Sequence, residues 1–386
     1  MFSVYLNKGE EDRILKGNQW IFSNEVLRFE GDIVSGEVCN VYTFDGEFLC
    51  RGFFNSSSKI MVRVLTLEQE DIDYNFFYKR LSAAKAYRDN LGFTNTGRQV
   101  FSEADLLPGL IVDKYADYLS IQILSLGFEK IKSMIVDILV RLYRPIGIYE
   151  RSDVSIRKKE GLEEFKGLLY GEVPDRVLIE ENGIKLYVDI INGQKTGYFL
   201  DQKENRKALR DYTNNKVVLD CFSHTGGFAL NAATNAHKVV AVDISEKACD
   251  DILTNVKLND FNNVEVVCEN VFDYLRYSEN KYRFDVIVLD PPAFTKSKET
   301  VEKAYRGYKD INLQALKMVK PGGFLVTFSC SQHMTPALFL EMIMDASIDS
   351  KRTVKMVDFR VQSKDHPTLL NQDESFYLKC VVLNVL

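Results

Sequence analysis

The chain reads VLDCFSHTGGFA from Val218 to Ala229, and this stretch decides the fold class. A short apolar run ends in an acidic residue, a loop with paired glycines follows, and an apolar helical segment begins. This order is typical of the first strand of an open parallel sheet, in which ligands bind beyond the carboxyl ends of the strands. Glycine lets the backbone approach such a ligand closely. Taken alone, the stretch is also compatible with an ordinary strand–helix corner.

Short β-branched runs recur along the same part of the chain, at residues 217–219, 239–242, 264–267, 285–289 and 323–328. Helical segments separate them, such as residues 245–258 and 310–318. Strands that alternate with helices predict a doubly wound parallel sheet. We therefore expect residues 177–386 to form one α/β domain.

The residues before this domain follow other patterns. Residues 1–72 contain short apolar stretches separated by glycine turns, which predicts a small β-rich barrel or sandwich. In residues 73–176 a helix with Tyr74, Phe77 and Leu81 on one face precedes strands, one further helix and more strands. We expect a linker helix and a small α+β middle domain there.

A second acidic residue strengthens the prediction of a ligand site. The run Val240-Ala241-Val242-Asp243 ends in a carboxylate 23 residues after Asp220. An acid at this place can hold both hydroxyls of a ribose. The spacing predicts a nucleoside ligand without distinguishing NAD from S-adenosylmethionine. The three-glycine dinucleotide fingerprint is absent from the sequence, which speaks against an NAD dehydrogenase.

The next strand leads into Asp290-Pro291-Pro292-Ala293-Phe294. Two prolines after an acidic strand end make a rigid backbone whose carbonyls have no neighbouring amide protons to bind. Such a loop can grip the polar edge of a planar base while an aromatic side chain stacks on its face. A simple strand-terminating turn is the alternative.

Cys330 follows the last parallel strand, in Phe328-Ser329-Cys330-Ser331, downstream of an expected tight turn at residues 320–323. A buried cysteine is usually a small apolar residue, which is the expectation for Cys39, Cys50, Cys249, Cys268 and Cys380. Cys330 differs because it lies at the edge where ligands bind. A thiol has a pKa near 8.5, so a nucleophilic cysteine needs local help to ionise.

The composition excludes several classes of protein. The 386 residues include 49 basic and 55 acidic ones, a net charge of -6, which excludes a uniformly basic surface but not a local basic groove. Seven cysteines with no CxxC and no zinc spacing indicate reduced thiols and no metal site. Neither a signal peptide nor an apolar run of membrane-spanning length is present, so we expect a cytoplasmic protein without membrane contact.

Together these residues resemble a known family, the RlmI-type 23S ribosomal RNA cytosine-C5 methyltransferases, which depend on S-adenosylmethionine. The resemblance covers essentially the whole chain. Its motifs are residues 193–202 (GQKTGYFLDQ), 220–229, 290–294, 306–312 (RGYKDIN), 328–331 and 365–367 (DHP), with Arg151 to Gly161 in the middle domain and Trp20-Ile21-Phe22 near the N-terminus. It implies a C-terminal class I, Rossmann-like methyltransferase sheet, the small α+β middle domain and an N-terminal PUA-like barrel that binds RNA.

The resemblance also implies residue roles. One segment would close over the cofactor, and it carries Lys195, Thr196, Tyr198 and Asp201. The methionine part of S-adenosylmethionine would meet Asp220, Phe222, Thr225, Gly226 and Gly227. The ribose would be held by Asp243, and the adenine would lie against Asn270, Val271 and Phe272. Asp290 would border the cofactor and begin the loop that holds the target base, and Cys330 would be the nucleophile.

Substrate contacts are expected from Pro291, Pro292, Phe294, Tyr308, Arg157 and Lys158. The last two lie in a charged segment that a solvated loop would also explain. Two positions depart from the family. Asn270 stands where relatives often have Asp, and its amide still offers an oxygen. Ala293 stands where relatives often have Lys, which removes a cation from the loop.

The function expected from these observations is formation of 5-methylcytosine in 23S ribosomal RNA through a covalent adduct between Cys330 and cytosine C6. The alternative is methylation of a purine nitrogen, such as guanine N7 or N2, which needs no thiol. A non-catalytic RNA-binding factor and an NAD dehydrogenase are the remaining possibilities. The expected partner is naked or early-assembly 23S RNA, and a homodimer would fit the family.

Overall fold

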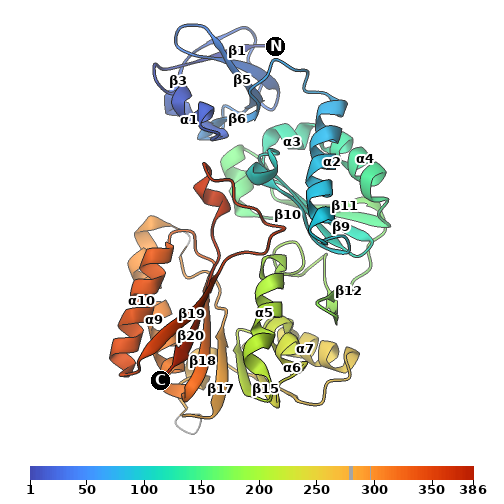
Figure 1. The fold of residues 1–386 in the computed structure, drawn as a ribbon. Helices are drawn as coiled ribbons and strands as arrows, with labels where there is room; N and C mark the ends of the chain where they lie inside the picture. Colours follow the sequence, from blue (N-terminus) through green and yellow to red (C-terminus); the bar gives the residue numbers. More distant parts are fainter. Residues whose placement is uncertain (278–280, 296) are drawn as a thin grey trace. The chain divides into compact units, whose positions relative to one another are not determined.

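The computed structural model describes residues 1–277, 281–295 and 297–386, and the chain forms two compact units (Figure 1). Unit 1 comprises Met1–Ile179, Val188–Leu200 and Lys364–Ser375. Unit 2 comprises Glu180–Tyr187, Asp201–Ser363 and Phe376–Leu386. Each unit is therefore assembled from segments that are distant in sequence. Within the described ranges, no helix combines the length and the apolar character needed to cross a membrane.

Unit 2 is built on a seven-stranded sheet in the order β16-β15-β14-β17-β18-β20-β19. Its strands are β14 (Val217–Cys221), β15 (Lys238–Asp243), β16 (Val264–Cys268), β17 (Phe284–Leu289), β18 (Val319–Ser329), β19 (Val354–Arg360) and β20 (Lys379–Val385). The first five are parallel, and β20 runs antiparallel to both β18 and β19. The central strands are apolar almost throughout because both faces of the sheet are covered.

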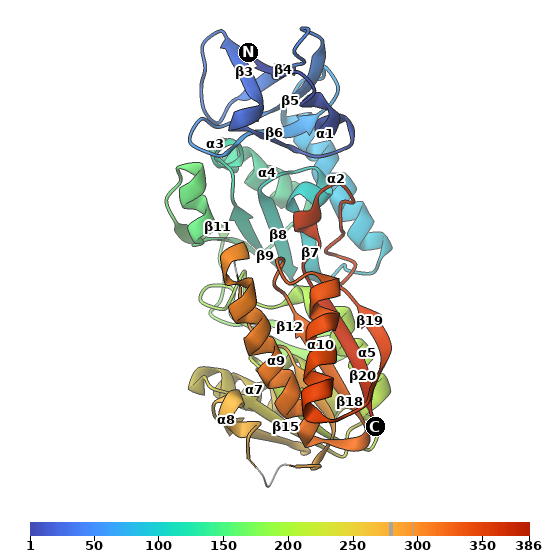
Figure 2. The ribbon, with the colours of Figure 1, turned by 90° about the vertical axis from the view of Figure 1, so that its left-hand side faces the viewer.

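Helices cover both faces of this sheet. They are α5 (Lys203–Thr213), α6 (Gly227–Ala233), α7 (Glu246–Leu258), α8 (Val271–Tyr274), α9 (Val301–Met318) and α10 (Pro336–Ser350). Helices α9 and α10 lie on one side, and α5, α6 and α7 lie on the other (Figure 1). Figure 2 shows α9 and α10 running side by side in front of the strands. Strand residues pack with α8, α9 and α10 in one apolar cluster.

Unit 1 contains two sheets. The first has six strands in the order β2-β6-β5-β4-β1-β3, namely β1 (Ser3–Leu6), β2 (Trp20–Phe22), β3 (Val26–Glu30), β4 (Val38–Tyr42), β5 (Phe48–Phe54) and β6 (Ile60–Thr66), with α1 (Glu11–Leu15). The second has five strands in the order β11-β10-β9-β8-β7, namely β7 (Thr96–Phe101), β8 (Leu110–Tyr115), β9 (Tyr118–Ile123), β10 (Gly147–Ser152) and β11 (Phe165–Gly171). A two-stranded sheet, β12 (Val177–Glu181) and β13 (Ile184–Val188), follows them in the chain.

The helices of unit 1 are α2 (Tyr74–Asn90), α3 (Leu126–Lys130) and α4 (Lys132–Tyr143). Phe53 of β5 joins the two sheets, because its ring packs 6.1 Å from that of Phe77 on α2 and 5.3 Å from that of Phe128 on α3. The small β-rich part and the α+β part therefore share apolar packing.

The fold class expected from the sequence is confirmed, with local differences. The helix expected at residues 310–318 begins at Val301. The turn expected at residues 320–323 is an irregular segment within β18, where Val319 pairs with Phe284 and Phe324 pairs with Val286. Pro321 lacks an amide proton and Gly322 has a φ of +81°, so this segment leaves the regular ladder without ending the strand.

Candidate functional site

The carboxyl edge of the parallel strands in unit 2 collects most of the predicted site residues. They are Asp220 on β14, Asp243 on β15, Asn270 after β16, Asp290 after β17 and Cys330 after β18. Cys221 on the central strand pairs with Val242 on one side and with Leu289 on the other. Since these strands are parallel and in register, the side chains that follow them meet at one edge.

The loop after β14 has an uncommon backbone. Phe222 and His224 adopt φ values of +61° and +53°, and Gly226 adopts +87°. Non-glycine residues in this left-handed region cost about 1–2 kcal/mol each, and such strain concentrates at ligand sites. The loop is held in place because the amide of Ser223 donates to the carbonyl of Val242 at 3.1 Å.

Asp220 is buried beneath this loop. Its Oδ2 accepts hydrogen bonds from Ser223 Oγ at 2.6 Å and from the Ala229 amide at 2.9 Å. Burial raises the pKa of Asp220 to about 7, although these two hydrogen bonds act in the opposite direction. Among the described residues, its Oδ1 has no hydrogen-bond partner, and neither has Oγ1 of the neighbouring Thr225.

These two buried oxygens fit the methionine part of S-adenosylmethionine. A buried polar atom without a partner costs about 1–3 kcal/mol, so each oxygen would gain by meeting a ligand. The carboxylate of Asp220 can accept from an ammonium group, and the Thr225 hydroxyl can donate to a carboxylate. The tight backbone supports this role: a side chain at Gly226 would place its Cβ 3.3 Å from Ile252 Cγ2, in an already strained conformation.

Asp243 is half-buried at the end of β15 and is held by backbone amides. Oδ2 accepts from the amide of His224 at 2.9 Å, and Oδ1 accepts from that of Ser245 at 3.0 Å. These bonds fix the carboxylate in the orientation in which a ribose could donate its two hydroxyls to it.

Asn270 caps helix α8, since its Oδ1 accepts from the amide of Phe272 at 2.8 Å. The amide oxygen expected to serve adenine therefore already has one donor, and an amide oxygen can accept a second. Val271 is buried in the core beside it. The ring of Phe272 lies 6.2 Å from that of Phe222 and 6.2 Å from that of Phe294. An aromatic row thus connects the loop after β14 with the loop after β17.

Asp290 follows β17, and Gln202 holds its carboxylate. The Nε2 atom of Gln202 donates to both carboxylate oxygens of Asp290, at 3.1 Å each. The Oε1 atom of Gln202 in turn accepts from Asn205 Nδ2 at 2.8 Å. Gln202 is buried, so this arrangement fixes the orientation of the Asp290 side chain.

The loop after Asp290 corrects one expectation. Pro291 is buried, Pro292 is exposed and Phe294 is half-buried, so Pro292 and Phe294 can still meet a base. Tyr308, in contrast, is fully buried on α9, with its ring 4.5 Å from that of Phe294 and its hydroxyl 3.1 Å from Ser331 Oγ. Tyr308 supports the ring of Phe294 from below and does not present a face for stacking on RNA.

Cys330 is half-buried, whereas Cys39, Cys50, Cys221, Cys249 and Cys380 are buried. Burial raises the pKa of each of those five thiols, which makes them poor nucleophiles. Cys268, at the end of β16, is the exposed one. Cys330 therefore combines partial accessibility with a place beside the Asp290 loop.

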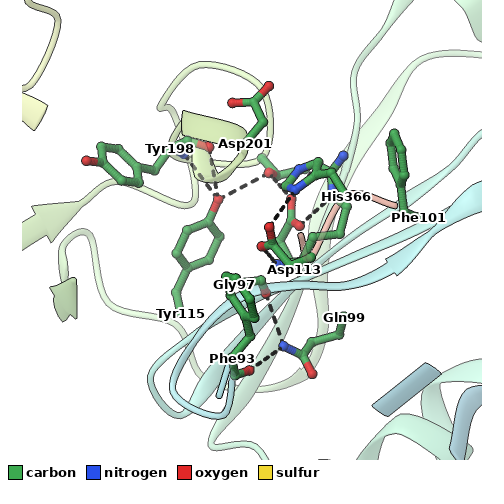
Figure 3. Close-up of polar contacts among 12 residues, drawn as sticks. Phe93, Gly97, Gln99, Phe101, Asp113, Tyr115, Tyr198, Asp201 and His366 are labelled. Atoms are coloured by element: carbon green, nitrogen blue, oxygen red, sulfur yellow. Dashed lines mark hydrogen bonds and ion pairs between the residues drawn. The ribbon is translucent and has the colours of Figure 1, made fainter. Parts of the chain in front are cut away.

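Three predicted cofactor residues belong to unit 1. Thr196 is buried, and its hydroxyl donates to Oδ2 of Asp113 on β8. Tyr198 is buried as well, and Figure 3 shows the Tyr115 side chain extending to its backbone, where the Tyr198 amide donates to the Tyr115 hydroxyl at 3.2 Å. Lys195 is exposed, has a φ of +53° and places its ammonium 4.5 Å from the ring of Phe199.

The same network fixes Asp113. Arg98 donates to its two carboxylate oxygens through Nε and Nη2, at 2.8 Å each. The backbone amide of Arg98 donates to Asp365 at 2.8 Å, and Asp365 contacts His366 Nδ1 at 2.9 Å. The motif residues Asp365 and His366 thus hold unit 1 together. In unit 2, the predicted Asp201 is buried and accepts from the Tyr377 hydroxyl at 2.7 Å.

The two basic residues predicted to contact RNA have different surroundings. Arg157 is buried, and its guanidinium donates to the carbonyls of Glu163 and Ile123 and to Glu129. Its charge is compensated inside unit 1, so the expectation of an RNA contact is corrected to a structural role. Lys158 is exposed and forms an ion pair with Glu164 at 3.2 Å, so it remains a candidate.

Sequence patterns assign no role to two residues in this part of unit 2, Gln202 and Lys379. Lys379 is buried at the start of β20, where its Nζ donates to the carbonyl of Ser331 at 2.7 Å. The available signal in the sequence was a lysine at the start of an otherwise apolar run. Lysine is almost never fully buried without a specific partner, so a lysine in such a run indicates a specific interaction.

Comparisons with known proteins show the family of the chain. Residues 4–67 match the model of a PUA-like domain, and residues 160–382 match that of an S-adenosylmethionine-dependent methyltransferase. The chain is 46% identical to a protein of Aeromonas salmonicida (strain A449) named Ribosomal RNA large subunit methyltransferase I, over 98% of both chains. A protein of Aliivibrio fischeri (strain MJ11) with the same name is 44% identical, also over 98% of both chains. A solved protein assigned as a methyltransferase and complexed with SAH is 25% identical, with a TM-score of 0.85 over the full length of both chains.

Proposed function

The chain belongs to the S-adenosylmethionine-dependent methyltransferase family, and from this premise we propose that it methylates C5 of a cytosine in the ribosomal RNA of the large subunit. The relatives that share its whole length are named for that RNA. The PUA-like match at residues 4–67 supplies a domain of an RNA-binding type. The observation that most supports cytosine C5 as the methylated atom is the half-buried thiol of Cys330. It follows β18 at the edge of the sheet where Asp290 follows β17.

Cytosine C5 needs activation before it can accept a methyl group. The Cys330 thiolate would attack C6, which forms a sulfur–carbon bond and makes C5 nucleophilic. When bound, S-adenosylmethionine supplies an electrophilic methyl group on its sulfonium. Loss of the C5 proton to a base and departure of the thiolate then restore the aromatic ring. The segment from Asp290 to Phe294 holds no second cysteine to act in this last step.

Residues of unit 2 would hold the two reactants. Asp220 and Thr225 would meet the methionine part of the cofactor and Asp243 its ribose, as their geometry permits. Asp290, oriented by Gln202, would bond the N3/N4 edge of the cytosine as charge shifts there. Pro292 and Phe294 would border the base. The base must leave its stack at a cost of a few kcal/mol, which favours single-stranded or loop RNA.

Methyl transfer from labelled S-adenosylmethionine to unmodified 23S RNA, followed by nucleoside analysis, tests the proposal. We expect label in 5-methylcytosine for the wild type and none for Cys330→Ala. The matched control is Cys268→Ala, which removes the exposed thiol at the end of β16 and should retain full activity. Label in a purine, or full activity of Cys330→Ala, would overturn the thiol mechanism and favour methylation of a purine nitrogen.

Finer properties follow as further parts of the proposal. The substrate is 23S RNA that is naked or in early assembly, which places the protein in the cytoplasm. The chain divides into a PUA-like part (residues 1–72), a middle part (73–176) and a methyltransferase part (177–386), except that the segments Val188–Leu200 and Lys364–Ser375 of the last part belong to unit 1. We further propose that it acts as a homodimer. Sedimentation of the protein with and without RNA would test the last point.

A further inference from the structure

Lys379 is a buried cation in the part of unit 2 that carries the nucleophile. It is the first residue of β20 and pairs with Ser329, the last residue of β18. Its side chain is among the largest that are fully buried, with 1% of its surface exposed. A buried ammonium costs several kcal/mol of lost hydration unless other groups replace the water.

The groups that replace the water lie around Cys330. The Nζ atom of Lys379 donates to the carbonyl of Ser331 at 2.7 Å and to that of Tyr377 at 2.7 Å. Cys330 thus stands between Ser329, which pairs with Lys379, and Ser331, which binds its ammonium. No carboxylate within the described part of the chain forms an ion pair with Lys379. Two carbonyls orient the ammonium but do not balance its charge.

The charge that balances Lys379 can come from the thiol. Burial lowers the pKa of Lys379 to about 8, and the Cys330 thiolate is the charged group that raises it. Such an interaction is reciprocal: if the thiolate favours the ammonium, the ammonium favours the thiolate to the same extent. The buried ammonium, which is costly to charge alone, and the thiolate can therefore be charged together.

Other ionisable groups approach this region from neighbouring elements. Tyr308, on α9, bonds the Ser331 hydroxyl, and burial raises its pKa so that it stays neutral. Asp290, after β17, and Arg360, on β19, act in opposite directions on Cys380, the residue after Lys379. Among these groups, Lys379 is a cation whose charge couples to Cys330.

We propose that Lys379 maintains Cys330 as a thiolate, which makes it a positioning residue for the methyl transfer proposed above. The proton that leaves Cys330 Sγ is balanced by the proton carried at Lys379 Nζ, so a neutral thiol–amine pair becomes a thiolate–ammonium pair without a change in net charge. The inference rests on the proposed function for its purpose, but the ionisation of Cys330 can be measured without RNA.

The test is the rate at which iodoacetamide alkylates Cys330, followed by peptide mass spectrometry between pH 5.5 and 9.5. For the wild type, we expect a half-maximal rate below pH 8.5, the ordinary value for a cysteine. Lys379→Met should raise this midpoint by at least about one pH unit because the cation is lost. Lys379→Arg keeps the charge and should retain the low midpoint. The matched control is Lys320→Met, which removes a lysine at the opposite end of β18 that pairs with Asp285.

The pH dependence of methylation provides a second measurement, which would not change if Lys379 had a purely structural role. The acid limb of the pH–rate profile should shift upward in Lys379→Met with the alkylation midpoint, and kcat should fall while KM for RNA stays within twofold. Equal midpoints in wild type and Lys379→Met, with S-adenosylmethionine binding intact in both, would overturn the inference. If Lys379→Met does not bind the cofactor, the inference is tested on the wild type and Lys379→Arg alone. A wild-type alkylation midpoint at or above pH 8.5 would then overturn the inference. Failure of the proposed function appears separately, as label in a purine or as activity without Cys330.

Discussion

The side-chain amide of Gln202 donates to both carboxylate oxygens of Asp290, at 3.1 Å each. Gln202 lies at the start of the unit 2 segment that leads into α5, and Asp290 lies after β17, so the bond joins residues 88 positions apart. The amide is shared between the two oxygens, which fixes the direction of their remaining lone pairs. The consequence is a base-binding group whose orientation is set before any RNA arrives.

Gln202→Leu should therefore lower kcat by about 10- to 100-fold, because a misoriented Asp290 no longer stabilises the charge that shifts onto the cytosine edge. Single-turnover methylation of 23S RNA measures the effect. The control is Gln332→Leu, since Gln332 is exposed after β18 and should tolerate the change. Equal rates for Gln202→Leu and wild type would show that Asp290 does not depend on this bond.

Asp220 should make cofactor binding depend on pH. Its pKa is raised to about 7 by burial, so below pH 7 it is protonated and cannot pair with the methionine ammonium. The affinity for S-adenosylmethionine should increase by up to about tenfold per pH unit up to pH 7 and then level off. Titration calorimetry should show this rise in the wild type and in Asp250→Asn, an exposed control on α7, but not in Asp220→Asn.

The same carboxyl affects the stability of the cofactor-free protein. Its folded pKa lies above the ordinary value of 3.8, so the folded state binds more protons than the unfolded state between about pH 4 and 7. As the pH rises from about 4 to 7, the free energy of unfolding of the wild type should therefore decrease relative to that of Asp220→Asn. Urea titrations at several pH values measure this difference. A difference that is constant with pH would contradict the raised pKa.

In unit 1, Asp113→Asn should lower the free energy of unfolding by about 3–5 kcal/mol, because Arg98 would stay buried without its counter-charge. The substitution also weakens the bond that holds Thr196. Urea unfolding followed by circular dichroism measures the loss. Asp117→Asn is the control, since Asp117 is exposed between β8 and β9, and a loss of similar size there would argue against the Arg98 pair as the cause.

Of the two predicted basic residues, Arg157 is buried and Lys158 is exposed, so Lys158 remains a candidate for RNA contact. Lys158→Ala should weaken binding to a 23S RNA fragment and reduce the slope of log K against log salt by about one, as expected for one lost phosphate contact. Fluorescence anisotropy at several KCl concentrations measures both. Lys79→Ala, an exposed lysine on α2, serves as the comparison. An unchanged slope in Lys158→Ala would leave this residue as part of a solvated loop.

The sequence predicted the sheet of unit 2 well because both of its faces are buried. Continuous apolar runs such as that of β17 identify such strands directly, and an acid or a cysteine after each run identifies the ligand edge. Asp220, Asp243, Asp290 and Cys330 were all located in this way. Because parallel strands in register end at one edge of the sheet, the strand assignments alone predict that these residues lie close together.

Apolar runs in the sequence do not predict the contacts that depend on the register of antiparallel strands or on buried charged side chains. Lys379 reaches Ser331 only because β20 returns beside β18 with Ser329 opposite Lys379, and no local pattern sets that register. Arg157 was expected at the surface because charged residues usually lie there. Its acceptors come from the chain near Ile123, Glu129 and Glu163, so its burial depends on packing that the local sequence does not show.

The discontinuous make-up of the two units has a consequence for biosynthesis. Unit 1 needs Asp365 to meet Arg98, and unit 2 needs β20 to complete its sheet between β18 and β19. At about 5–20 residues per second, roughly 2 to 10 seconds pass between synthesis of Cys330 and of Lys379. During that time the nascent chain carries an open sheet edge beside β18 and lacks the ammonium next to Cys330. The Cys330 thiol therefore acquires Lys379 as its partner only after β20 has been synthesised.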